Sequence, residues 1–402
     1  MGIKPHPIYK MRKLISHIIG MGLGALALLP SFCDDIPIFN LNGTVGSVWR
    51  LELPIVVNSF LWVYLVIFIG LLCIYLWFCN IHPALKVGST YLYVSSFYSA
   101  APYISFNALL LVIPAVYLYV LIKNVADKKI IINWIVALFW MEVLICILQF
   151  LGKDVLMNFD RPQRIFLGTV MQHMRAGCLF AIMAPFLLLK NKLYIIPLMI
   201  VSILVYSSSL ALALCAGVFI YFIISNIKLK TKVIIISSII ILAIGHSLYN
   251  ITSFRVAFTV GRIPCWIKIF MTGFGCTYHT STVLCSDINL GLLSSIKGHG
   301  LNMFQCLYPV LIGDGNPFAQ CHNDWLQLFW ETGFIGLGIA LLFVFNIIRK
   351  LYKIGSYIWI AGIVIISVNM FFAFPMFMLP QTPFLVLTFF ALCERETKKE
   401  II

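Results

Sequence analysis

Long apolar stretches, separated by short polar ones, make up most of the chain. A helix needs about 20 apolar residues to cross the hydrocarbon core of a bilayer. We therefore expect the following stretches to be membrane-spanning helices: 14–32, 58–79, 88–104, 106–122, 131–151, 166–189, 193–207, 210–225, 233–249, 325–348, 356–373 and 376–393. The pattern predicts an all-α, polytopic transmembrane helical protein with about 12 spans.

The composition agrees with this pattern. Hydrophobic residues make up 61% of the chain and charged residues only 10%, and the mean hydropathy is +1.00, which excludes a water-soluble domain. The first apolar stretch follows Lys10, Arg12 and Lys13, as the apolar part of a signal peptide would. Because "LLPSFCDD" is a poor cleavage site and many spans follow, we expect a retained first helix.

The charges predict an orientation. With the N-terminus in the cytoplasm, the inner segments are 1–13, 80–87, 123–130, 190–192, 226–232, 349–355 and 394–402, and they hold 19 of the 28 Lys and Arg residues. Cytoplasmic loops are the ones enriched in Lys and Arg. Both termini are therefore expected in the cytoplasm. The net charge of +14 mainly reflects this topology, so we do not interpret it as a nucleic-acid-binding surface.

One long segment, residues 250–324, lies between expected spans on the outer side, and loops of that length usually carry function. It separates an N-terminal transmembrane bundle, 1–249, from C-terminal transmembrane helices, 325–402. An outer compartment permits one or two disulfides, while buried reduced thiols are the alternative. No cysteine or histidine spacing indicates a metal site. The cysteines of this segment are Cys265, Cys276, Cys285, Cys306 and Cys321.

Arginines are prominent among the polar residues expected on the outer side. Their guanidinium groups suit bidentate contact with phosphate oxygens. Cations gathered at the outer membrane edge point to a lipid-linked phosphate or pyrophosphate. Alternatively, such side chains anchor the protein among lipid headgroups, which we prefer for Arg50 and Lys153. The candidate phosphate ligands are Arg164, Arg175, Arg255 and Arg262.

His322 lies at the expected outer end of a helix, where the dipole disfavours imidazolium. A neutral imidazole there could act as the general base toward an acceptor hydroxyl, with Asn323 and Asp324 orienting the ring or the sugar. The alternative is a purely structural histidine at a helix end.

Helical spacing predicts which of the following residues share a helix face with His322. On a continuous helix, Gly333 returns to the His322 face three turns further on, where another helix could pack closely. Glu331 falls on the opposite face, so we expect it to make a buried structural hydrogen bond. Arg262 likewise has Gly273 eleven residues after it, in a predicted helix lying against the membrane surface.

These motifs resemble the superfamily of O-antigen ligases and O-antigen polymerases. The similarity lies in "VGRIPCWIKIFMTGFG", "GHGLNMF" and "HNDWLQLFWETGFIGLG", with weaker support from "RIFLG" at Arg164. Members share an Arg-x-x-x-Trp segment, a Gly-x-Gly with a following Phe, and a His-Asn followed by Glu-x-Gly. The matching residues here are Arg262, Trp266, Gly298, Gly300, Phe304, His322, Asn323, Glu331 and Gly333.

The resemblance implies a GT-C-like, metal-independent and cofactor-free inverting glycosyltransferase of the bacterial inner membrane, with its active site in the periplasmic loop. It would take a glycan from undecaprenyl pyrophosphate and join it to a hydroxyl of the lipid A core, as ligases do, or of a second lipid-linked repeat unit, as polymerases do. The resemblance assigns pyrophosphate binding to Arg262 and action on the acceptor to His322.

Two features depart from the family pattern. Ligases carry a second arginine in an outer turn that reads "YSSSLALAL" here, with Ser208 or Ser209 at that position. Arg175 and Arg164 are the candidates to replace it. An insertion also separates Gly273 from Gly298, two positions that usually lie closer together.

Two other functions remain open. A metal-dependent enzyme using polyprenyl monophosphate sugars could bind its cation through Asp34 and Asp35. A flippase or transporter of the same lipid-linked glycan would need no general base, although transporters usually distribute polar groups through their spans.

Overall fold

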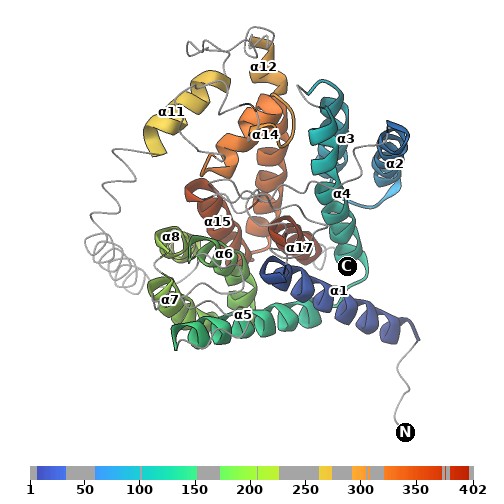
Figure 1. Cartoon of the computed structure of the whole chain (residues 1–402). Coiled ribbons are helices and arrows are strands. Elements are labelled where there is room, and N and C mark those ends of the chain that lie inside the picture. Colours follow the sequence, from blue (N-terminus) through green and yellow to red (C-terminus); the bar gives the residue numbers. More distant parts are fainter. Residues whose placement is uncertain are drawn as a thin grey trace.

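The structure, a computed structural model, describes residues 7–32, 59–99, 102–151, 173–205, 207–225, 262–273, 292–304, 307, 321–373, 376 and 381–397. Every regular element in these ranges is a helix (Figure 1). The all-α prediction is therefore confirmed for the part of the chain that is described.

Helices overlap eleven of the expected spans, although 88–104 is divided between two helices, and the expected span 233–249 lies outside the described residues. Among the described residues, three segments are long and apolar enough to cross a membrane: Ile104–Asn124, Lys128–Phe150 and Asp324–Lys353. The elements are α1 (Pro7–Phe32), α2 (Ser59–Phe78), α3 (Pro83–Phe97), α4 (Pro102–Asn124), α5 (Lys128–Phe150), α6 (His173–Lys190), η3 (Lys192–Tyr194), α7 (Ile195–Leu204), α8 (Ser208–Ile224), α11 (Arg262–Gly273), α12 (Leu292–Lys297), α14 (Asp324–Lys353), α15 (Tyr357–Phe372) and α17 (Gln381–Glu396).

Polar side chains fix where several helices begin. Asp127 accepts a hydrogen bond from the Lys129 N–H, Ser207 from the Leu210 N–H and Asn323 from the Leu326 N–H. Each bond satisfies one of the backbone donors that the first turn of a helix leaves without an intrahelical partner. The short polar segments between apolar stretches thus set the helix boundaries.

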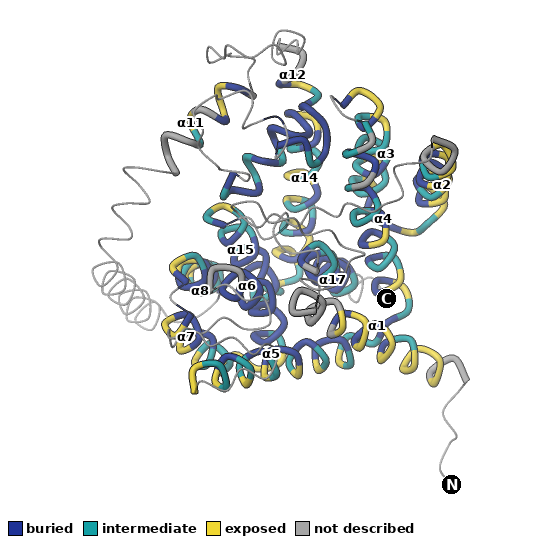
Figure 2. Tube along the Cα trace, in the orientation of Figure 1, coloured by how far each residue is buried: buried dark blue, intermediate teal, exposed yellow. Residues whose placement is uncertain are grey.

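One apolar core joins helices from both ends of the chain. It contains Ile19 of α1, Phe139 of α5, Phe186 of α6 and Phe389 of α17. The rings of Phe186 and Phe389 meet edge to face at 5.3 Å. Figure 2 shows buried positions where α6, α15 and α17 pack and exposed positions on the outer sides of α1, α2 and α7. Many of the exposed positions on α2 are large and apolar, Phe78 among them, as in a lipid-facing surface.

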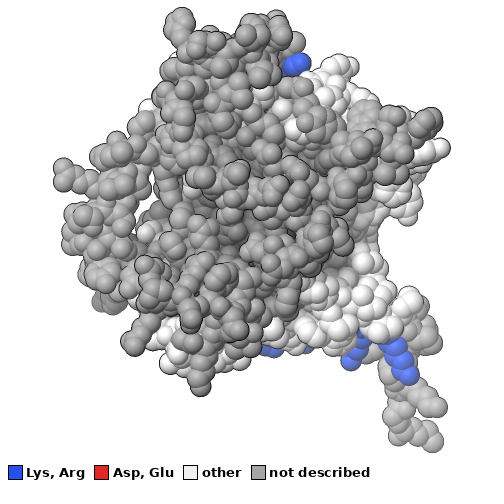
Figure 3. All heavy atoms as spheres, in the orientation of Figure 1, with Lys and Arg blue, Asp and Glu red and all other residues white. Residues whose placement is uncertain are grey.

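The helices do not all run in one direction. In Figure 1, α3, α4 and most of α14 run along the molecule, whereas α1 and α5 lie across one end of it. Figure 3 shows Lys and Arg atoms mainly along that edge. We call it the basic end and define it by Lys123, Lys128, Lys190, Lys192 and Lys350.

Contacts at the basic end bring together segments far apart in sequence. Lys190 donates to Asn133 Oδ1 at 2.7 Å, linking the end of α6 to α5. Lys123 pairs with Glu394 and Lys128 with Glu396, both at 2.8 Å, linking the end of α17 to the turn between α4 and α5. Four expected inner segments, 123–130, 190–192, 349–355 and 394–402, thus have described residues at this end.

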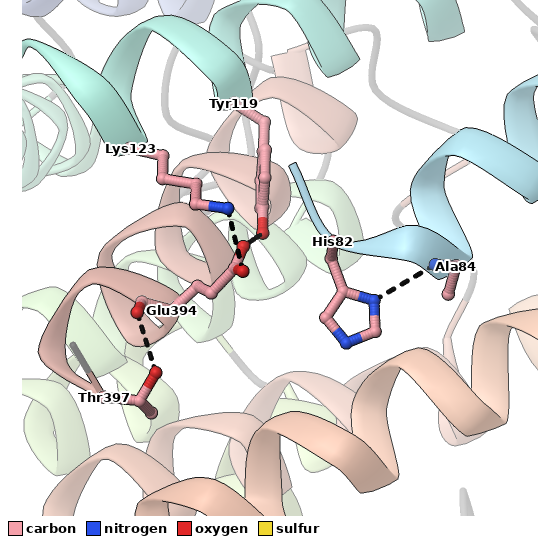
Figure 4. Close-up of polar contacts among 6 residues, drawn as sticks. All are labelled: His82, Ala84, Tyr119, Lys123, Glu394 and Thr397. Carbon is pink, nitrogen blue, oxygen red and sulfur yellow. Dashed lines mark hydrogen bonds and ion pairs between the residues drawn. The ribbon is translucent and has the colours of Figure 1, made fainter. Parts of the chain in front are cut away.

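A buried polar cluster lies within the basic end (Figure 4). Glu394 accepts hydrogen bonds from Tyr119 and Lys123. His82 precedes α3 and accepts from the Ala84 N–H through Nδ1 at 3.2 Å. Burial lowers the pKa of His82 below its usual value, and the nearby Glu394 carboxylate partly opposes this shift. The Glu394 contacts tie α4 to α17, and His82, at the start of α3, lies within the electrostatic influence of Glu394.

Candidate functional site

The centre of the candidate site is a break in α14. Gly333 has φ 65° and ψ −170°, which interrupts the helix and divides it into a first arm, 324–332, and a second arm, 334–353. In Figure 1 the two arms are steeply inclined to each other. Only glycine adopts this backbone conformation readily. The prediction of one continuous helix through Gly333, with Gly333 on the His322 face, is therefore wrong.

The backbone of residues 299–300 runs alongside the end of the first arm. The N–H groups of His299 and Gly300 donate to the carbonyls of Trp330 and Glu331 at 3.2 and 2.9 Å. A Cβ atom on Gly298 would lie only 2.2 Å from the Glu331 carbonyl oxygen, so the close approach requires glycine. The loop thus satisfies carbonyl groups that the break leaves without partners in the helix.

Glu331 binds the same loop through its side chain. Its carboxylate accepts hydrogen bonds from the Asn302 N–H at 2.8 Å, the Phe304 N–H at 3.4 Å and the Gln327 side-chain amide at 3.0 Å. Gln327 in turn accepts from the Cys321 N–H at 3.5 Å. The glycine-containing loop, the first arm and the residue before His322 therefore form one hydrogen-bonded unit around a fully buried carboxylate.

His322, Asn323 and Asp324 differ in their positions relative to α14. His322 precedes the helix and has φ 54°, in the left-handed region, so its side chain leaves the chain in a direction that a helical residue would not have. Asn323 is the N-cap, and its Oδ1 accepts from the Leu326 N–H at 3.0 Å. Asp324 is buried, and its Oδ2 accepts from the Met376 N–H at 3.0 Å.

Helix α11 packs against the first arm and against the residue before His322. The Trp266 indole N–H donates to the Cys321 carbonyl at 2.8 Å, and the Trp330 indole N–H donates to Thr272 at 3.2 Å. Arg262 is the first residue of α11, one helical turn before Trp266, and Gly273 is the last. The structure thus brings the segment that begins at Arg262 next to His322, 60 positions later in the sequence.

The start of α6 packs against the start of α8. A Cβ atom on Gly177 would lie 2.1 Å from Ser207 Oγ, so the two segments touch. Arg175 is two residues before Gly177 and therefore lies close to the turn where the resemblance places a second arginine. Arg164, the other candidate for that role, lies outside the described residues.

The turn before α8 lies away from the basic end. Lys192 donates to Tyr221 near the end of α8, and Lys128 lies over the Trp359 ring near the start of α15. The end of α8 and the start of α15 therefore both lie at the basic end. Since Gly217 in the middle of α8 also packs against Ile365 in the middle of α15, the two helices are antiparallel, and the start of α8 lies near the end of α15. Trp266 of α11 contacts Phe371 at that end of α15, with ring centres 5.6 Å apart.

The sequence analysis assigned no role to His299, yet this residue lies inside the site. Its ring lies against Trp330, with ring centres 4.1 Å apart, and its Nε2 is buried without a hydrogen-bond partner among the described residues. Burial, and secondarily the charge of Lys297, lower its pKa to about 4. The signal in the sequence was the triplet Gly298-His299-Gly300, in which two flexible residues flank an aromatic one.

Several predicted site residues lie beyond what the structure describes. Arg255 is outside the described residues, as are Asp34 and Asp35, and only the backbone is described for Arg175 and Arg262. The pairing of the four loop cysteines before Cys321 likewise remains a prediction. Among the described residues, no group of three His, Cys, Asp or Glu side chains could hold a metal ion.

Comparison with known proteins adds no relative. No protein-family model matches the chain, and a search of curated proteins finds no match.

Proposed function

We propose that the chain is a glycosyltransferase of the bacterial inner membrane that moves a glycan from undecaprenyl pyrophosphate to an acceptor hydroxyl in the periplasm. The observation that carries this proposal is the packing of α11 against the residue before His322, through the Trp266 to Cys321 hydrogen bond. It supports a joint site for Arg262 and His322, the two residues to which the resemblance assigns chemistry.

The proposed reaction needs no metal or cofactor. His322 removes the proton of the acceptor hydroxyl as its oxygen bonds to the anomeric carbon. The bond from that carbon to the pyrophosphate oxygen breaks with inversion, and the pyrophosphate leaves with the bonding electron pair. Arg262 and Arg175 stabilise the charge that develops on the leaving group, as fixed cations do in a site of low dielectric constant.

The proposal includes a GT-C-like arrangement of about 12 spans, with α1 and α5 strongly inclined to the rest, and with 250–324 as a periplasmic catalytic loop. Both termini would be cytoplasmic. Its support is the collection of predicted inner segments at the basic end, opposite the starts of α8 and α11. The acceptor would be the lipid A core for a ligase or a second lipid-linked repeat unit for a polymerase.

A glycan ladder on a gel tests the proposal. Cells that lack their own enzyme are complemented with the wild type, His322→Ala or Arg262→Ala. We expect the wild type to restore long chains and both variants to leave single or unjoined repeats on the carrier. His17→Ala and Arg349→Ala, which remove the same residue types elsewhere, should behave as wild type.

The same gel separates the two enzyme types. Chains that lengthen on the carrier but never reach the lipid A core identify a polymerase, and complete chains that fail to transfer in the variants identify a ligase. Normal ladders from both variants would reject the proposed site and favour the transporter.

A further inference from the structure

A cavity of about 280 Å³ lies between the two arms of α14 and is bordered by α3, α4, α15 and α17. From α14 it is lined by Asp324 and Leu328 of the first arm and by Gly336, Ala340 and Phe343 of the second. The bend at Gly333 creates this space, because a straight helix would place Asp324 and Phe343 nearly 30 Å apart, at about 1.5 Å per residue.

The wall of the cavity is apolar with one carboxylate. Asp324 is 1% exposed, and its Oδ1 has no hydrogen-bond partner among the described residues, while Oδ2 is occupied by the Met376 N–H. Buried polar atoms are normally hydrogen-bonded, so an orphaned carboxylate oxygen in a cavity wall calls for a donor from outside the chain.

Two further orphaned groups belong to residues next in sequence to cavity-lining ones. The side-chain amide of Asn369 and the hydroxyl of Thr382 are buried and also lack hydrogen-bond partners among the described residues. They directly precede Met370 and Pro383, which line the cavity. The described wall is therefore mainly hydrophobic, and residues with unsatisfied polar groups are sequence neighbours of that wall in α15 and α17.

We propose that this cavity binds hydrocarbon of a lipid substrate whose head group donates a hydrogen bond to Asp324 Oδ1. The volume suits roughly ten carbon atoms, if each takes about the 30 Å³ of a water molecule. A hydroxyl-bearing head group supplies the donor that Asp324 Oδ1 lacks. Resting on the proposed function, the occupant is the isoprenoid chain of the glycan carrier, with a sugar hydroxyl at Asp324, two residues from His322.

Photo-cross-linking in native membranes tests the occupant. The photoreactive residue p-benzoylphenylalanine replaces Ala340 in the cavity or, as a matched control, Leu342, which is 59% exposed on the same arm. Mass spectrometry of the adducts should find polyprenyl species enriched severalfold at Ala340 and phospholipids at Leu342. Phospholipid adducts in the same proportion at both positions would overturn the proposal.

A binding measurement gives independent evidence. Undecaprenyl phosphate should raise the melting temperature of the purified protein, whereas phosphatidylglycerol should not. Ala340→Phe should lose that shift while its own melting temperature is kept or raised, because filling a cavity adds packing. Leu342→Phe should keep the shift. An unchanged shift in a folded Ala340→Phe variant would contradict the proposal.

The two experiments distinguish this inference from the proposed function. Polyprenyl adducts at Ala340 in a protein that transfers no glycan would support the lipid-binding cavity and contradict the proposed glycosyltransferase activity. Glycan transfer without those adducts would support the glycosyltransferase activity and contradict the lipid-binding cavity.

Discussion

His322, Asn323 and Asp324 are consecutive, yet each has a different physical task. Asn323 uses its side-chain oxygen to cap α14, and Asp324 becomes part of a buried cavity wall. His322 is held in a left-handed conformation directly before them, outside the helix. A left-handed conformation at a non-glycine residue is uncommon and needs support from its surroundings. The fixed segments on both sides of His322, Cys321 with its hydrogen bonds and Asn323 with its cap, provide that support.

The neutral His299 predicts how stability depends on pH. Its folded pKa, about 4, lies below the usual value near 6.5, so the unfolded chain binds a proton before the folded protein does. The contribution is fully present above pH 6.5 and is lost as the pH falls toward 4, in total about 3 kcal/mol. Thermal unfolding of the detergent-solubilised protein between pH 7 and pH 4.5 should show the loss.

His299→Phe keeps an aromatic ring against Trp330 and removes the titrating group. Its melting temperature should fall less between pH 7 and pH 4.5 than that of the wild type. An equal fall in both proteins would show that His299 is not held neutral by burial.

The contact between Gly177 and Ser207 makes a prediction about the second phosphate ligand. Arg175→Ala should reduce glycan transfer about tenfold or more, because a charge-assisted hydrogen bond to the leaving group is lost. Ser209→Arg, added to Arg175→Ala, should restore part of the activity by placing a guanidinium group in the adjacent turn. Transfer assays on membranes measure both, and wild-type activity in Arg175→Ala would assign the role elsewhere.

At the scale of single elements, the length of the apolar stretches located helices well but gave little information about their shape. Expected spans such as 106–122 and 131–151 fall on α4 and α5 because apolar length alone identifies a long buried or lipid-facing helix. The bend in α14 could not be predicted in this way, because a glycine within an apolar run is compatible with a continuous helix. The bend depends on the close approach of Gly298 to Gly333, 35 positions away, and on the hydrogen bond from Gly300 to the Glu331 carbonyl, and no local pattern encodes these contacts.

Gly333→Ala tests the importance of the bend. The new Cβ would lie 2.2 Å from the Ile296 carbonyl oxygen, in a conformation that L-residues disfavour, so we expect a loss of more than about 2 kcal/mol in stability. Gly338→Ala is the matched control, because nothing lies within 4 Å of its Cβ position. It should be neutral or stabilise the helix by up to about 1 kcal/mol. Equal melting temperatures for Gly333→Ala and Gly338→Ala would mean that the bend is dispensable.

At the scale of the whole molecule, charge and hydropathy predicted which segments meet at one end. The tilt of the helices and the cavity between them depend on packing. The Lys-rich turns gather at the basic end through pairs such as Lys128 with Glu396. The steep inclination of α1 and α5 could not be predicted, because hydropathy sets the length of a helix and its neighbours set its tilt. Similarly, the motifs predicted a joint site for Arg262 and His322, but the cavity depends on five helices, α3, α4, α14, α15 and α17, from separate parts of the sequence.

Reporter fusions test the orientation. Alkaline phosphatase folds only outside the cytoplasm, so fusions after residue 280 should be active, and fusions after residues 191 and 355 should be inactive. A fluorescent protein that matures only in the cytoplasm should give the opposite pattern at the same positions. Active phosphatase after residue 191 or 355 would invert the proposed topology and place His322 on the cytoplasmic side.

Transfer by the purified protein tests the central claim most directly. The protein is mixed with an undecaprenyl-pyrophosphate-linked glycan and either acceptor, the lipid A core or a second lipid-linked repeat unit, in excess chelator. We predict that the wild type forms a joined product and that His322→Ala and Arg262→Ala each lower the rate about 100-fold or more. Either no product from the wild type with both acceptors, or wild-type rates from both variants, would contradict the account.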